Sequence, residues 1–124
     1  MKEYTVKVDE FGGTEWFLNG QRHREDGPAI KFNNGTECWY LNGKRHRTDG
    51  PAAEWADGTN CWFQNDQLHR EDGPAIELAD GTKRWFINGE EYTEVEFAAR
   101  TKTKELTVAD IEKLLGYKVK IVKS

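Results

Sequence analysis

Three side chains that could do chemistry recur together along the chain, at a fixed interval of 23 residues. A histidine is followed directly by an arginine, and an aspartate comes three positions after the histidine. The nine residues are His23, Arg24, Asp26, His46, Arg47, Asp49, His69, Arg70 and Asp72. Imidazole, guanidinium and carboxylate groups in such a set could ligate a metal, bind an anion or transfer protons.

The spacing of these residues argues against both metal binding and catalysis. If each repeat contributes two antiparallel strands, equivalent residues lie roughly 10 Å apart, whereas zinc bonds its ligands at about 2 Å. A catalytic site needs unlike groups that converge on a point, and a repeat places like groups along a line. Ser124 is the only serine. We therefore predict that the protein is not an enzyme and holds no metal or cofactor.

Two roles remain open for the nine residues. In the structural role, the histidine and the aspartate bond across a break in the strand, while the arginine lies over an aromatic ring of the neighbouring repeat. In the functional role, the histidines and arginines form a ladder that is presented to an acidic partner or to phosphates.

The same period governs the residues that build strands and turns. Its fixed positions hold four tryptophans and all three prolines of the chain: Trp16, Trp39, Trp62, Trp85, Pro28, Pro51 and Pro74. Each tryptophan strand ends at Asn-Gly, the pair that best forms a type I′ hairpin, although Asn65-Asp66 departs from it. The pattern predicts a mainly β fold. It is an elongated antiparallel meander of hairpin repeats, with roughly seven or eight strands in a single twisted sheet.

Consecutive residues of each tryptophan strand are apolar: Trp39 and Leu41 are expected to point to one face of the sheet and Tyr40 to the other, so both faces carry aromatic rings. We expect the tryptophan column to form the core of the sheet. The alternate column is expected to face outward; it consists of Phe17, Tyr40, Phe63 and Phe86. Cys38 and Cys61 share one repeat position, which places them roughly 9–10 Å apart. A disulfide needs Cα atoms within about 7 Å, so we expect free thiols in a reducing compartment.

The repeat sheet is predicted over residues 1–92, and a C-terminal helix–helix–strand segment over residues 93–124. Thr93 and Glu96 form a capping box, and the first helix is predicted to run to about Lys102. A second helix begins at Thr107 and ends before Gly116. This segment either caps the open end of the sheet or docks separately, and the sequence leaves both possibilities open.

The charge of the chain is uneven. Residues 1–92 hold 11 basic and 17 acidic residues, a net of −6, and residues 93–124 hold 7 and 5, a net of +2. An acidic body argues against nucleic acid, whose phosphates need clustered lysine and arginine. The sequence has neither a run of apolar residues long enough to span a membrane nor an apolar signal-peptide core. We expect a cytoplasmic protein that does not bind membranes.

The string Trp-x-x-Asn-Gly-x-x-His-x-x-x-Gly, repeated every 23 residues over about 4–92, resembles the MORN repeat. The segments His-Arg-x-Asp-Gly-Pro-Ala are similar to the variant of bacteriophage and large-virus proteins. Arginine stands at Arg24, Arg47 and Arg70 where glycine is usual in that family. The resemblance implies hairpin units that act as protein-interaction scaffolds, some of them linked to lipid binding, and it carries no catalytic residues. The C-terminal stretch also resembles the ends of small phage proteins.

These features predict a phage or viral accessory protein that binds a host protein, such as a component of a defence system, and inhibits or redirects it in the host cytoplasm. The expected contact surface is the His/Arg/Asp ladder together with the outer aromatic column. One alternative is a binder that sequesters a phosphorylated small molecule or nucleotide signal. A second alternative is a self-assembling or membrane-associated scaffold. A homodimer through a sheet edge or the C-terminal segment is also left open.

Overall fold

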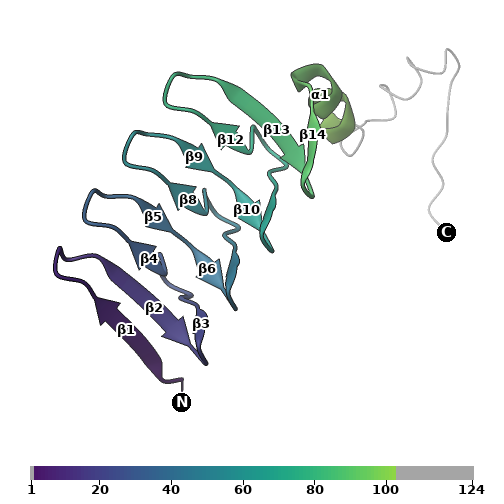
Figure 1. Ribbon diagram of the computed structural model, residues 1–124. Helices are drawn as coiled ribbons and strands as arrows, with labels where there is room; N and C mark the ends of the chain where they lie inside the picture. Colours follow the sequence, from purple (N-terminus) through teal and green to yellow (C-terminus); the bar gives the residue numbers. More distant parts are fainter. Residues whose placement is uncertain (1, 103–124) are drawn as a thin grey trace, which may run out of the picture.

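The computed structural model describes residues 2–102 as one elongated antiparallel meander that is not closed into a barrel (Figure 1). Each strand of the main sheet is antiparallel to the next. The order is β1 (Tyr4–Val8), β2 (Thr14–Leu18), β4 (Ile30–Lys31), β5 (Glu37–Cys38), β8 (Ala53–Glu54), β9 (Asn60–Cys61), β12 (Ile76–Glu77), β13 (Lys83–Ile87) and β14 (Glu90–Tyr92). The predicted mainly β meander is confirmed.

Each repeat also forms a second, smaller hairpin. These hairpins use β3 (Gln21–Arg22) with β2, β6 (Tyr40–Leu41) with β7 (Lys44–Arg45), and β10 (Phe63–Gln64) with β11 (Gln67–Leu68). The strands of the central repeats are therefore shorter and more numerous than predicted, because Trp39 and Trp62 each change pairing partner and separate two short strands. Trp39 N–H donates to the carbonyl of Ala52 at 2.6 Å, while its own carbonyl accepts from His46 N–H at 3.1 Å.

The hairpin turns have the predicted left-handed geometry. Asn42 and Gly43 have φ of 51° and 79°, which fits a type I′ turn. Asn65 and Asp66 adopt the same turn with φ of 49° and 69°, although the second position is not glycine. Asparagine and aspartate tolerate this region better than other side chains, so the departure from Asn-Gly leaves the fold unchanged.

The core of the sheet is a row of small and medium residues that run across the repeats. Cys38, Ala53, Cys61 and Ile76 pair in one register across β5, β8, β9 and β12. Ala52, Ala53, Cys61 and Phe63 form one buried cluster, and Trp39 packs against it. The four tryptophans are half-buried, so they lie at the border of this core and not at its centre.

The sheet ends in one helix, α1 (Glu94–Lys102), which follows the predicted boundaries. Thr93 Oγ1 accepts from Glu96 N–H at 3.2 Å, and Glu96 accepts from Thr93 N–H at 3.1 Å. This reciprocal pair is the predicted capping box. Phe97 is buried where α1 packs on β13 and β14. The predicted second helix and last strand lie outside the described residues. No helix within residues 2–102 is long and apolar enough to cross a membrane.

Candidate docking face

A recurring contact, here called the arginine clamp, holds each returning strand to the tryptophan of its own repeat. In the central repeat, Cζ of Arg47 lies 3.9 Å from the centroid of the Trp39 ring. Its Nε donates to Asp49 Oδ1 at 2.9 Å, and its Nη1 donates to the carbonyl of Pro51 at 3.2 Å. Contacts at 2.8–4.0 Å form the equivalent clamps of Arg24 with Trp16, Asp26 and Pro28, and of Arg70 with Trp62, Asp72 and Pro74. The clamp accounts for the repeated Arg-x-Asp-Gly-Pro string.

The glycine of this string leaves room for the guanidinium group. A Cβ atom at Gly50 would lie 2.9 Å from Cζ of Arg47, and at Gly27 and Gly73 the corresponding distance is 2.8 Å. None of these glycines has a left-handed φ. The extended conformation expected before proline is open to any residue, so the backbone does not require glycine here. The role of these glycines is therefore steric.

Two predictions about the recurring histidines, arginines and aspartates are wrong. The arginine lies over the tryptophan of its own repeat and not over a ring of the neighbouring one. The Asn-Gly hairpin causes this, because it folds Arg47 back beside Trp39. The aspartate bonds the arginine, as Asp49 bonds Arg47, and not the histidine.

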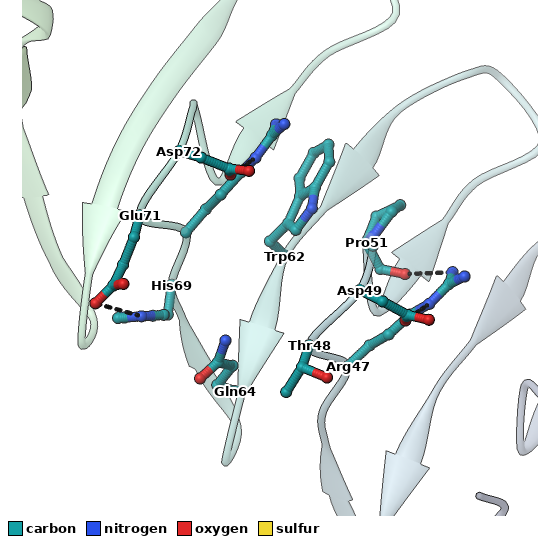
Figure 2. Close-up of a pocket in the computed structure, with 11 residues that line it drawn as sticks. Arg47, Thr48, Asp49, Pro51, Trp62, Gln64, His69, Glu71 and Asp72 are labelled. Carbon is teal, nitrogen blue, oxygen red and sulfur yellow. Dashed lines mark hydrogen bonds and ion pairs between the residues drawn. The ribbon is translucent and has the colours of Figure 1, made fainter. Parts of the chain in front are cut away.

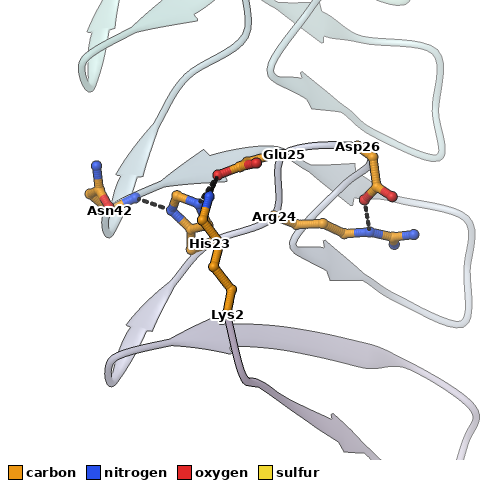
Figure 3. A network of polar contacts seen from close by, with 6 residues as sticks. All are labelled: Lys2, His23, Arg24, Glu25, Asp26 and Asn42. Atoms are coloured by element: carbon orange, nitrogen blue, oxygen red, sulfur yellow. Dashed lines mark hydrogen bonds and ion pairs between the residues drawn. The ribbon is translucent and has the colours of Figure 1, made fainter.

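The histidines connect consecutive repeats. Nδ1 of His46 accepts from Asn65 N–H at 3.0 Å, in the hairpin turn of the next repeat. The equivalent bonds join Asn42 to His23 at 2.9 Å and Asn88 to His69 at 3.0 Å. Figure 3 shows the bond from Asn42 N–H to His23. The other ring nitrogen of His23, Nε2, lies 3.3 Å from Glu25 Oε1. Because the histidine side chains are buried or half-buried in this role, they are structural links between repeats.

The column expected to face outward is partly buried. Phe63 and Phe86 are each 7% exposed, so the expectation that they lie on an outer contact surface is wrong. The Arg45 guanidinium covers the Phe63 ring at 4.1 Å, and Phe63 belongs to the buried cluster. Phe17 and Tyr40 are half-buried. Among residues 2–102 no second layer covers this face, so side chains of the sheet itself fold over the rings.

Open grooves lie between successive clamp segments. One groove of about 340 Å³ lies between residues 24–26 and 46–49, and its floor is Trp39 and Leu41. The next, of about 680 Å³, lies between residues 47–51 and 69–72 with Trp62 on its floor (Figure 2). We call the surface that carries these two grooves the groove face.

Carboxylates dominate the exposed rim of the groove face. The side chains of Asp26, Asp49 and Asp72 are 85%, 79% and 86% exposed, whereas those of the three clamp arginines are only 20–26% exposed. Glu25 and Glu71 add further exposed carboxylates. A hydrogen bond from Lys2 is the main cause that holds the pKa of Glu25 below its usual value. The exposed rim of the groove face is therefore formed mainly by carboxylates.

Two further residues of the clamp were not identified from the sequence. Glu54 and Glu77 accept from Nη1 of Arg47 at 3.4 Å and of Arg70 at 3.3 Å. They occupy one repeat position, seven residues after their arginines, which is the signal that could have identified them. Each of these glutamates gives the guanidinium group of its arginine one more hydrogen bond within the protein.

No metal or thiol site stands out in the part of the chain that the structure describes. Within residues 2–102, no group of three or more histidine, cysteine or acidic side chains could hold a metal ion. Cys38 and Cys61 are free, as expected, and both pair with Ala53 from opposite sides. Burial raises the pKa of Cys61 to about 11 and also raises that of Cys38. The absence of catalysis stays a prediction.

Comparison with protein-family models, with curated proteins and with solved structures finds no match. The resemblance to MORN repeats therefore rests on the sequence motif.

Proposed function

We propose that this protein is a non-enzymatic interaction module that docks a cationic, extended segment of another protein on its groove face. The observation that carries the proposal is the exposed row of aspartates above two adjacent grooves. Each clamp arginine already bonds an aspartate and a proline carbonyl, as Arg47 does with Asp49 and Pro51. These contacts support a basic partner in place of the acidic one expected from the sequence.

The repeat sets the pattern that such a partner would carry. Equivalent positions of the meander lie two strand spacings apart, roughly 10 Å. A segment in the extended polyproline II conformation advances about 3.1 Å per residue with three residues per turn, so every third residue of the partner points the same way and faces the next aspartate. Basic residues at that interval would meet successive carboxylates. Their methylene stems would lie against Trp62 and Pro51 in the groove between the second and third clamps.

The wider setting follows from the resemblance to the MORN-like repeats of phages and large viruses. It makes the partner a host protein that this chain inhibits or redirects, and the chain an accessory protein that acts in the host cytoplasm. The aligned acidic rim would steer a basic partner towards the grooves and speed association at low salt. A phosphorylated ligand would face this rim directly, so the geometry gives the sequestration alternative no comparable support.

Affinity capture with matched variants tests the proposal. The groove variant D49N/E71Q/D72N removes three carboxylates but keeps an oxygen acceptor for each arginine or histidine contact. The control variant E10Q/E90Q/E94Q changes the net charge equally at exposed positions outside the grooves. Wild type and control should capture the same stoichiometric partner from a lysate of the cell in which the protein acts, and the groove variant should not. Equal capture by both variants would refute the groove face as the docking surface.

A further inference from the structure

The first strand of the sheet has an open edge. Within residues 2–102, β1 pairs only with β2, in a register that sets Val6 opposite Trp16. Trp16 directs its N–H to Ala29 and its carbonyl to His23, both on the side away from β1. Val6 and Trp16 are therefore a non-hydrogen-bonded pair, and the N–H and carbonyl of Val6 point outward. By alternation, the main-chain groups of Tyr4 and Val8 also point outward.

This edge lacks two of the usual protections against strand pairing, proline and a bulge, and Lys7 is its only charged residue. Five consecutive residues of β1 pair with β2 without a bulge, and β1 contains no proline. Val6 is 42% and Val8 67% exposed. At the opposite end of the sheet β14 is the last strand, and α1 packs on β13 and β14 (Figure 1). The two ends of the sheet therefore differ, and pairing of β1 with β1 of a second copy joins like edges and gives a closed two-fold dimer.

The sequence of β1 is complementary to itself in one register. With Thr5 on a two-fold axis, Tyr4 lies opposite Val6 of the second copy, and both carry outward main-chain groups. Glu3 then lies opposite Lys7 of the second copy, and the symmetry repeats this ion pair. A register centred on Val6 would instead set Glu3 against Asp9, and one centred on Lys7 would set Lys7 against itself. Like charges directly opposite are unfavourable, so Thr5 is the favoured centre.

We propose that two copies of this chain pair through β1, antiparallel about Thr5, and join their meanders into one continuous sheet. Such an axis runs perpendicular to the sheet, so both copies direct their groove faces to the same side. The dimer would thus present a doubled row of grooves to a partner with several basic segments. A single pair of short strands buries little surface, so the association is weak and reversible. This dimer does not depend on the proposed docking function.

Charge exchange across the edge tests the pairing and its register. The variants E3K and K7E each place like charges opposite one another at both symmetry-related positions, and each alone should dimerise about tenfold more weakly than wild type. An equimolar mixture of E3K and K7E restores both ion pairs in a heterodimer and should associate as well as wild type. The control K44E makes the same charge change as K7E at an exposed site away from β1, and it should leave dimerisation unchanged.

Sedimentation equilibrium up to about 1 mM protein, which reaches even weak association, measures these effects. The proposal predicts a monomer–dimer equilibrium for wild type, weakening for each single variant and recovery in the mixture. Circular dichroism verifies that each variant is folded. A wild-type monomer at every concentration overturns the proposal, as do a K7E dimer of wild-type affinity and a mixture that fails to recover. Growth beyond dimers would overturn the closed two-fold pairing, because it requires a second edge to take part.

Discussion

Replacing Gly50 by alanine should destabilise the protein only while Arg47 is present. An alanine Cβ at this position would lie 2.9 Å from Cζ of Arg47 and 3.2 Å from both Nε and Nη1. Gly50 has no left-handed φ and precedes a proline, so the alanine backbone itself is unstrained. The cost of G50A therefore comes from displacing the guanidinium group from the Trp39 ring.

The size and sign of the effect follow from this contact. Overpacking a well-filled site costs about 1–3 kcal/mol, so G50A should lose that much stability in the wild-type background. R47A alone should cost about 2–3 kcal/mol, because it removes both the stacking on Trp39 and the bonds to Asp49 and Pro51. In the R47A background, G50A should stabilise the protein by about 0.4–1 kcal/mol, because alanine lowers the conformational entropy of the unfolded chain. The coupling between the two substitutions is then about 1.5–4 kcal/mol.

Urea denaturation followed by tryptophan fluorescence measures the free energy of unfolding of the four proteins in this cycle. The exposed substitution K44A is the control and should change stability by less than about 0.5 kcal/mol. A neutral G50A, or an equal cost of G50A with and without Arg47, would show that the guanidinium group does not occupy the space above Gly50.

Three further predictions test other contacts. Because it leaves Asn65 N–H without the Nδ1 acceptor, H46A should lower the free energy of unfolding by about 1–3 kcal/mol in urea titrations. Cys61, whose pKa burial raises to about 11, should react with iodoacetamide at pH 8 about a hundredfold more slowly in the folded protein than in urea. The hydrogen bond from Arg45 is the main cause that lowers the pKa of Asp66 below 3.8. Its stabilising effect is present above the unfolded pKa and is lost as pH falls through the folded one, so the difference in unfolding midpoint between wild type and D66N should shrink below about pH 4.

The repeat made the meander predictable, because its signals are local. Asn42-Gly43 specifies a type I′ turn by itself, and Thr93 with Glu96 specifies the start of α1. Strand lengths were less predictable, since Trp39 divides its two main-chain groups between two partners. That division depends on how the hairpin and the main sheet meet, and no local propensity encodes it.

The site was predictable in composition but not in its contacts. Eight of the nine recurring residues, all but His23, line the two grooves. The ring beside Arg47 and the bond made by His46 depend on chain reversal and on the offset between repeats. The burial of Phe63 was missed because alternation identifies the two faces of a strand without showing which side chains cover each face. Arg45, from the adjacent hairpin strand, covers that ring.

Carboxyl footprinting of the complex tests the central claim, that the groove face binds a basic partner through its exposed carboxylates. Carbodiimide-activated coupling of an amine labels accessible aspartates and glutamates, and mass spectrometry locates the label. With the captured partner bound, labelling of Asp49, Glu71 and Asp72 should slow several-fold, while that of Glu10 and Glu94 stays unchanged. Unchanged labelling of the three groove carboxylates, with protection at other positions, would contradict the account and place the docking surface elsewhere.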